Sequence, residues 1–237
     1  MKIGAALIDI DGVLYVGDPY RFVSNTTRRS RHSVAGRLQA LGYAVPEPWI
    51  ITAPVAAAAH LREGGRTRCF LLTTPNARRD FEEAGIVPVE ENADAVVVAD
   101  AGDDLTYASM NRAFRLLVGG ADLVALEKDR YWMGADGLML SAGPFVAALE
   151  YAAGKEAEVI GKPSPAFFRR ALREIGADPG EAAMIGDDIV TDIGGARASG
   201  MKGILVRTGK YREETVRVSG ITPDLVIDSL ADLPDYI

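Results

Sequence analysis

Residues 7–15 read Leu-Ile-Asp-Ile-Asp-Gly-Val-Leu-Tyr, an apolar strand that ends in two aspartates one residue apart and a glycine. Because side chains alternate between the two faces of a strand, Asp9 and Asp11 point the same way, and Ile8 and Ile10 face the opposite side. Open α/β sheets bind ligands at the carboxyl ends of their strands, and converging carboxylates there are costly unless a cation or a proton relieves the repulsion. The stretch therefore predicts a site of chemistry at a strand end.

An aspartate pair followed by glycine also begins many calcium-binding loops. Those loops need further oxygen ligands at alternate positions and a distal glutamate. Here Val13, Leu14 and Tyr15 follow instead, and apolar residues flank the pair on both sides. The flanks favour a buried strand over a solvated cation loop, although the motif alone leaves the catalytic interpretation as one hypothesis of two.

A second acidic cluster follows another apolar strand. Residues 182–188 read Ala-Ala-Met-Ile-Gly-Asp-Asp, and residues 189–199 are typical of a helix that ends at Gly200. Asp188 is predicted to cap this helix, and Asp192 lies in its first turn, where the helix dipole favours an acidic residue. Capping does not explain Asp187.

Two features typical of phosphate sites lie between the acidic clusters. A short apolar strand, Phe22-Val23, runs into Ser24-Asn25-Thr26-Thr27, whose side-chain oxygens and backbone N–H groups suit phosphoryl oxygens, although such residues also cap helices, here over 31–41. A second strand delivers Lys162 into a turn restricted by Pro163 and Pro165. Its position is therefore specified more closely than that of an ordinary surface lysine.

In this order, the four motifs resemble those of the haloacid dehalogenase superfamily of phosphatases. They are Asp-x-Asp-Gly, Ser-Asn, Gly-Lys-Pro, and Gly-Asp-Asp with Asp192. Further similarity over 102–117, 130–153 and 208–212 indicates the subgroup IIA, with a large C2-type cap between the second and third motifs. The resemblance implies an α/β fold, a Rossmann-like core with a parallel sheet and an inserted α/β cap domain.

The resemblance also implies a magnesium-dependent phosphatase that acts through a phospho-aspartate. Asp9 would attack phosphorus, and Asp11 would protonate the leaving oxygen and then deprotonate water. The implied roles are catalytic for Asp9, Asp11, Ser24 and Lys162; substrate-binding for Asn25, Gly12 and Thr26; Mg²⁺-binding for Asp9, Asp11 and Asp187; and supporting for Asp192 and Asp188. A family member without catalytic activity that binds a metabolite or a signalling partner is the alternative.

Alternating strand and helix patterns predict the domain organisation. Residues 1–48 and 157–237 are expected to form the core, and residues 49–156 the cap that selects the substrate. The expected cap helices are 52–62, 77–84, 105–118 and 143–153, and its expected strands are 69–72, 95–99 and 123–126. Residues 130–139 are candidate substrate contacts; the alternative is that their aromatic side chains pack within the cap. Arg28 is a second candidate; the alternative is that it is a solvated charge at the start of a helix.

The connection between the first two motifs departs from the family pattern. Residues 16–21 alone separate the first apolar stretch from the strand at Phe22. A crossover between parallel strands needs about a dozen residues or more. Either the sheet is rearranged or a helix-and-loop segment is absent between Val16 and Tyr20, and we favour the second interpretation.

Composition narrows the class of partners. The net charge of −7 argues against a general nucleic-acid binder, and no stretch approaches the roughly 20 apolar residues of a membrane span. The single cysteine, Cys69, excludes an intramolecular disulfide, and no secretory signal is visible, so we expect a cytoplasmic protein. The expected ligand is a small phosphorylated substrate, and the resemblance makes a homodimer plausible. A receiver-type signalling domain is disfavoured, because it is one compact domain without a cap.

Overall fold

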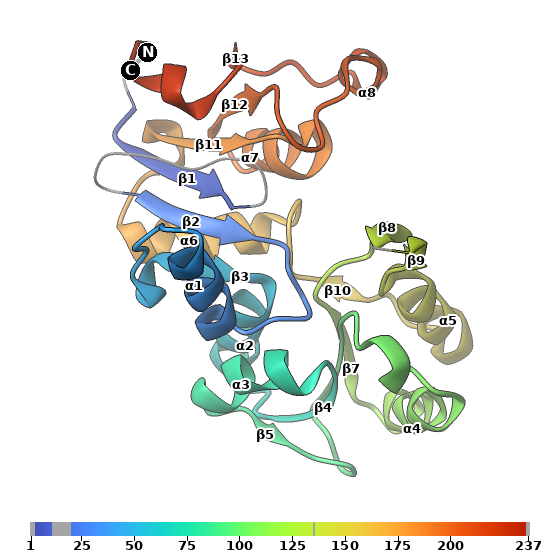
Figure 1. The fold of residues 1–237 in the computed structure, drawn as a ribbon. Helices are drawn as coiled ribbons and strands as arrows, with labels where there is room; N and C mark the ends of the chain where they lie inside the picture. The colour runs from blue at the N-terminus through green and yellow to red at the C-terminus, as the bar shows by residue number, and fades with distance from the viewer. Residues whose placement is uncertain (1–2, 11–19, 135, 236–237) are drawn as a thin grey trace. The chain divides into compact units, whose positions relative to one another are not determined.

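The computed structural model describes residues 3–10, 20–134 and 136–235 of the 237-residue chain (Figure 1). Its residues group into two compact units. The first unit contains residues 1–24, 45–51 and 162–237, and the second contains residues 25–44 and 52–161. No helix in the described part of the chain is long and apolar enough to cross a membrane. The domain boundaries expected at 48/49 and 156/157 stay a prediction.

The first unit is built on a six-stranded sheet with the order β13-β12-β11-β1-β2-β3. Strand β1 pairs in parallel with β11 on one side and with β2 on the other. The strands are β1 (Ala5–Asp9), β2 (Tyr20–Ser24), β3 (Ile50–Thr52), β11 (Ala182–Gly186), β12 (Lys202–Val206) and β13 (Leu225–Ile227). The two central strands are buried along most of their length, as their near-continuous apolar sequences predict.

Short helical segments surround this sheet (Figure 1). They are α6 (Pro165–Ile175), the π-helical segment η4 (Ile189–Gly194), α7 (Gly195–Ala198), α8 (Glu213–Ser219), and the 3₁₀ turns η1 (Glu47–Trp49), η3 (Pro179–Glu181) and η5 (Leu230–Asp235). Close packing holds α7 against α6, since a Cβ on Gly195 would lie 2.5 Å from the Phe168 ring and 2.9 Å from Pro163. Glycine is therefore required where the two helices meet.

The second unit has its own parallel sheet, with the order β10-β7-β6-β4-β5. Its strands are β4 (Arg68–Leu72), β5 (Val87–Pro88), β6 (Ala95–Val98), β7 (Asp122–Ala125) and β10 (Glu158–Val159). A separate antiparallel hairpin joins β8 (Tyr131–Gly134) to β9 (Gly137–Leu140). One buried cluster joins β4, β6 and β7 to the helices α4 and α5.

The helices of the second unit begin at hydroxyl caps in most cases. They are α1 (Arg31–Ala40), α2 (Ala53–Glu63), α3 (Pro75–Glu83), α4 (Tyr107–Val118) and α5 (Gly143–Ala153), with the 3₁₀ turn η2 (Gly102–Asp104). Thr52, Thr74 and Thr106 each accept a hydrogen bond from the backbone N–H three residues later. The repeated strand-helix pattern of the sequence is confirmed, and with it the α/β fold.

The short connection after the first motif does not rearrange the sheet. Strands β1 and β2 are adjacent and parallel, with Asp9 opposite Val23. Residues 11–19 of that connection lie outside the described residues, and so do two predicted site residues, Asp11 and Gly12. The predicted helices and strands are otherwise confirmed within a few residues, whereas the β8–β9 hairpin was not predicted.

Candidate active site

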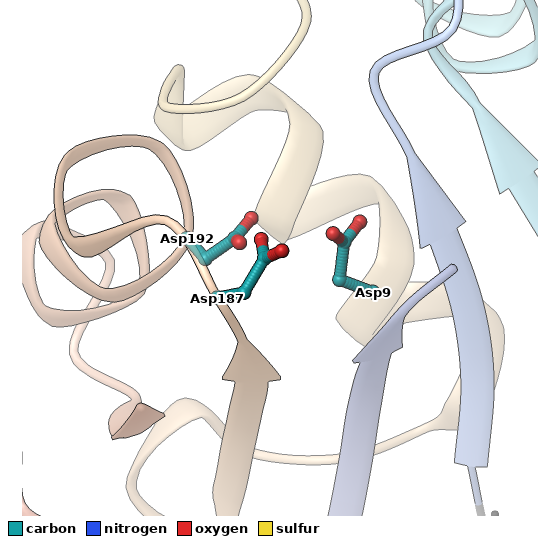
Figure 2. Close-up of side chains that lie close together, drawn as sticks. All are labelled: Asp9, Asp187 and Asp192. Atoms are coloured by element: carbon teal, nitrogen blue, oxygen red, sulfur yellow. The ribbon is translucent and has the colours of Figure 1, made fainter. Parts of the chain in front are cut away.

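Three buried aspartates converge at one edge of the first sheet (Figure 2). Asp9 is the last residue of β1, and Asp187 directly follows β11. The two strands pair with Ile8 opposite Ile185, so the register brings both aspartates to the carboxyl ends of neighbouring strands. One carboxylate oxygen from each of Asp9, Asp187 and Asp192 lies within 4.8 Å of the others.

Asp192 reaches this edge from η4, and glycine makes room for it. A Cβ on Gly186, at the end of β11, would lie 2.3 Å from Oδ2 of Asp192. The same Oδ2 accepts a hydrogen bond from the Asp188 N–H at 3.1 Å. The Asp192 side chain is thus packed directly on the strand end, and its other oxygen, Oδ1, remains available to Lys162.

Lys162 bridges two of the carboxylates. Its Nζ donates to Oδ1 of Asp9 at 2.8 Å and to Oδ1 of Asp192 at 2.7 Å, and the lysine is only 4% exposed. Burial alone lowers the pKa of Lys162, but the charges of Asp192 and Asp9 outweigh burial and raise that pKa. The ammonium therefore stays charged. It joins Asp9, which is 153 residues away in the sequence, to Asp192, which is 30 residues away.

Burial and mutual repulsion disfavour the ionised forms of these carboxyls, and the single positive charge of Lys162 does not fully offset this effect. Burial raises the pKa of Asp187, and the neighbouring Asp9 carboxylate adds to this, while the backbone N–H of Lys210 opposes it. Burial raises the pKa of Asp192 to about 7, although the Lys162 ammonium opposes this rise. Three buried carboxyls against one ammonium leave an excess of acceptor oxygens at the strand ends.

Lys210 is a site residue that the sequence reasoning missed. Its backbone N–H donates to Oδ2 of Asp187 at 2.9 Å, and its Nζ lies 3.5 Å from Oδ2 of Asp188. Asp188 caps η4 as predicted, because its Oδ1 accepts hydrogen bonds from the N–H groups of Val190 and Thr191. Burial favours the protonated form of Asp188, but the Thr191 N–H and the Lys210 charge lower its pKa overall.

The donor set of this cluster suits a hard divalent cation. All three candidate ligands are carboxylates, and the described part of the chain places no histidine or cysteine among them. Mg²⁺ and Ca²⁺ prefer oxygen ligands of this kind, whereas softer metals prefer sulfur or imidazole ligands. The excess of buried negative charge is a second reason why a cation fits here, because the cation relieves the repulsion among the carboxylates.

The residues predicted to bind phosphate divide between the two units. Ser24 ends β2, is buried, and follows Val23, the partner of Asp9 in the sheet. Asn25 and Thr26 belong to the second unit. Within that unit the loop that follows them is fastened at two points, because Thr74 Oγ1 donates to the Arg28 carbonyl at 2.7 Å and the Ser30 N–H donates to Asn76 Oδ1 at 2.7 Å.

Two sequence candidates for substrate contact meet within the second unit. The Arg28 guanidinium lies 3.5 Å from Oδ2 of Asp100 and 5.8 Å from the centre of the Trp132 ring. Trp132 belongs to the 130–139 segment that the sequence analysis selected. Arg28 retains 43% of its side-chain exposure, so its remaining N–H donors face solvent.

Comparison with known proteins gives the family. A profile described as haloacid dehalogenase-like hydrolase matches residues 17–87, and one described as HAD-hydrolase-like matches residues 159–233. Phospholysine phosphohistidine inorganic pyrophosphate phosphatase of Homo sapiens is 41% identical over 92% of this chain and 79% of its own length. The human haloacid dehalogenase-like hydrolase domain-containing protein 2 is also 41% identical, over 98% of this chain and 95% of its own.

Solved structures agree with this relation. The p-nitrophenyl phosphatase from Archaeoglobus fulgidus matches with a TM-score of 0.92 and 28% identity over 100% of both chains. The 4-nitrophenylphosphatase from Thermotoga maritima matches with a TM-score of 0.90 and 29% identity, over 99% of this chain and 97% of its own. The chain therefore belongs to the haloacid dehalogenase-like hydrolase family and is an enzyme of its phosphatase branch.

The alignments also bear on the short connection after the first motif. The alignment with the human domain-containing protein 2 runs over 251 positions, whereas this chain has 237 residues in total. That relative therefore carries residues inside the aligned region that this chain lacks. The first family profile begins to match only at residue 17, beyond Asp9 and Asp11. Neither finding shows where those extra residues lie, so the absence of a segment between the first two motifs stays a prediction.

Proposed function

We propose that this chain is a magnesium-dependent phosphatase that hydrolyses a small phosphorylated metabolite through a phospho-aspartate on Asp9. The observation that carries the proposal is the hydrogen bond between Lys162 and Asp9 beside Asp187, at the carboxyl ends of β1 and β11. This arrangement brings a carboxylate, an ammonium group held in place and a second acidic group together at the strand ends, where open α/β sheets bind ligands.

Asp9 is the proposed nucleophile. Its carboxylate attacks phosphorus and the leaving oxygen departs, so that one difficult displacement becomes two easier ones, and water then cleaves the aspartyl phosphate. Lys162 supports this step by neutralising the charge of Asp9 and of the phosphoryl oxygens, and Asp192 holds Lys162 in position. Asp11 is proposed as the acid and base, and Ser24, Asn25, Thr26 and Gly12 as the groups that bind phosphoryl oxygens.

Asp9 and Asp187, with the Asp11 backbone carbonyl, are the proposed ligands of Mg²⁺. When bound, this ion would neutralise negative charge on the phosphoryl group. Phosphoryl transfer depends mainly on such charge neutralisation and on the positioning of the reacting groups. Lys210 and Asp188 assist indirectly, because the Lys210 N–H fixes the orientation of the Asp187 carboxylate.

The second unit is proposed to select the substrate. The family relatives include a phosphatase named for phospholysine, phosphohistidine and inorganic pyrophosphate, and phosphatases named for nitrophenyl phosphate. Arg28 and Trp132 offer a cationic and an aromatic surface that suit a leaving group carrying an anionic or planar part. A homodimer and a cytoplasmic location stay predictions; the exposed apolar side chains of Met133 and Leu138 on the hairpin support self-association.

The deciding experiment is phosphate release by the purified chain with and without Mg²⁺. The substrates are nitrophenyl phosphate, sugar phosphates, pyridoxal phosphate, phosphoglycolate, pyrophosphate and phospholysine. Asp9→Asn is expected to lower kcat at least about a thousandfold while the fold is retained, because the amide is not a nucleophile. Asp228→Asn is the matched control, since Asp228 is exposed and, among the residues that the structure describes, pairs with Arg207 alone.

Three results contradict the proposal. Full activity in Asp9→Asn excludes the nucleophilic role, and activity that survives EDTA excludes the metal. Absence of release from every substrate, in a protein that binds Mg²⁺, favours the alternative of a metabolite-binding member without catalytic activity. The expected absence of a segment beside the first motif would give that outcome a physical reason.

A further inference from the structure

The second unit contains a cavity of about 370 Å³ that takes no part in the site described above. It is lined by the end of β4, the residues at and after β5, Arg78 of α3 and the first turn of α4. All of these residues belong to the second unit, so the cavity is a feature of that unit alone. Apolar side chains such as Phe70 and Val89 share its wall with polar ones.

Two residues that line this cavity each carry a buried hydrogen-bond donor without a partner. Oγ1 of Thr73 is buried without a hydrogen bond, and Thr73 is only 4% exposed. The Nε of Arg78 is likewise buried without a hydrogen bond, and Arg78 forms no ion pair among the described residues. Leaving such groups unsatisfied is costly, and buried polar groups in proteins are almost always paired.

The first turn of α4 adds positive potential to the same wall. Thr106 caps this 12-residue helix and Ser109 completes the capping box, and both residues line the cavity with Ala108. The box satisfies the Ser109 N–H, while the N–H groups of Tyr107 and Ala108 have no acceptor within the helix. The helix dipole is positive at this end and favours an anion.

The charged side chains around the cavity limit how negative a ligand can be. Arg112 is paired with Glu90, so these two lining residues largely neutralise each other. Asp104 also lines the cavity and repels an anion, whereas the Arg78 guanidinium attracts one. The balance suits a single anionic group placed at Thr73, Arg78 and the helix end, on a molecule whose remaining part contacts the apolar wall.

We propose that this cavity is a second ligand site, separate from the acidic cluster, which binds a small molecule through one phosphate or carboxylate group. Thr73 Oγ1 and Arg78 Nε donate to that group, and the N-terminus of α4 completes its surroundings. Occupancy by such a ligand supplies the two buried donors with the acceptors that the protein itself does not provide.

The test is a pair of NMR titrations of the full-length, ¹⁵N-labelled protein without added metal. Sodium phosphate and sodium acetate are added separately, with sodium chloride at matched ionic strength as the reference. We expect saturable shifts of the Thr73 and Ala108 amides and of the Arg78 Nε–H signal. Shifts with phosphate alone or acetate alone assign the anionic group, and shifts with both assign an oxyanion of either kind. Residue-resolved signals keep this site distinct from the acidic cluster, so failure of one proposal leaves the other intact.

Variants make the assignment specific. Arg78→Gln is expected to weaken the affinity of the responsive anion at least about tenfold, as loss of a charged hydrogen bond does. Arg79→Gln removes the same charge one residue away, from a side chain that pairs with Glu83, and is expected to leave the affinity unchanged. Equal affinities in the two variants, or shifts reproduced by sodium chloride, overturn the proposal.

Thr73→Val supplies a second readout that a merely structural threonine would not give. Valine replaces the unpartnered hydroxyl by a methyl group of the same shape, so the ligand-free protein is expected to become more stable in thermal unfolding. The same variant is expected to bind the anion more weakly. A Thr73→Val protein that is less stable without ligand and binds the anion as tightly as the wild type contradicts the assignment.

Discussion

The two units treat buried polar groups in opposite ways. At the edge of the first sheet, acceptors are in excess, because one ammonium, Lys162, serves two of three buried carboxyls. In the cavity of the second unit, donors are in excess, because Thr73 and Arg78 find no acceptor. A surplus of acceptors fits a cation, and a surplus of donors fits an anion, so the same accounting of buried groups points to two different ligands.

Replacing Lys162 is expected to have the largest effect on this comparison. Lys162→Met leaves Asp9, Asp187 and Asp192 without a cation, and breaking a buried ion pair in this way should cost about 4 kcal/mol of unfolding free energy. Turnover should fall with it. Because Mg²⁺ then offers the only compensating charge, we expect added MgCl₂ to recover more stability in the variant than in the wild type.

Urea unfolding with and without MgCl₂ measures this effect, and phosphate release measures turnover. Lys128→Met is the matched control, because Lys128 pairs with Glu150 at a side chain that is 41% exposed, where an ion pair contributes little. A Lys162→Met protein as stable as the wild type without metal would show that the carboxyls are not in electrostatic conflict.

The substitution Gly186→Ala disturbs the acidic cluster without removing any charge from it. The Cβ of Gly186→Ala would lie 2.3 Å from Oδ2 and 2.5 Å from Cγ of Asp192, so Asp192 must move away from Lys162. We expect a loss of about 3 kcal/mol in urea unfolding and a lower kcat. Gly180→Ala is the control, since a Cβ there meets nothing within 4 Å. If the two variants behave alike, the position of Asp192 does not depend on this contact.

The sequence indicates two members of the acidic cluster because each of them lies at the end of an apolar strand. Asp9 and Asp187 come directly at strand ends, where parallel pairing brings them together. Gly186 belongs to the Gly-Asp-Asp motif and Lys210 to the similar stretch 208–212, but neither residue type by itself indicates a contact with the acidic cluster. Gly186 acts through the space it leaves for Asp192, and Lys210 acts on Asp187 through a backbone N–H that every residue except proline possesses.

Helix α5 and the β8–β9 hairpin show the same limit in the fold. The expected helix over 143–153 is found at Gly143–Ala153, because proline near its start and glycine at its end mark both boundaries. The hairpin has no alternation of buried and exposed residues, as β8 and β9 expose most of their side chains. The Asp136-Gly137 pair at the start of β9, a sequence common at hairpin turns, was the available signal.

Asp80 extends the comparison to a buried carboxyl whose hydrogen-bond donors are neutral groups. It accepts hydrogen bonds from the Arg31 N–H at 2.9 Å and from Thr52 Oγ1 at 3.4 Å, and it forms no ion pair among the described residues. Burial raises the pKa of Asp80 to about 6, although those hydrogen bonds and the Arg31 charge oppose the rise and Glu83 adds to it. Its ionised form is therefore disfavoured in the folded state.

The smallest expected effect is the pH dependence that Asp80 causes. A carboxyl whose folded pKa is raised stabilises the fold below its unfolded pKa near 4, and this contribution is lost as the pH rises through about 6. Asp80→Asn keeps an acceptor oxygen but does not ionise, so its stability relative to the wild type should increase by about 2 kcal/mol between pH 4 and pH 6 and then stay constant. Urea unfolding of both proteins across this range measures the difference, in which groups common to both cancel. A difference that is constant from pH 4 to pH 7 would mean that the folded pKa of Asp80 is not raised above its unfolded value, as expected for a carboxylate that is paired with a cation.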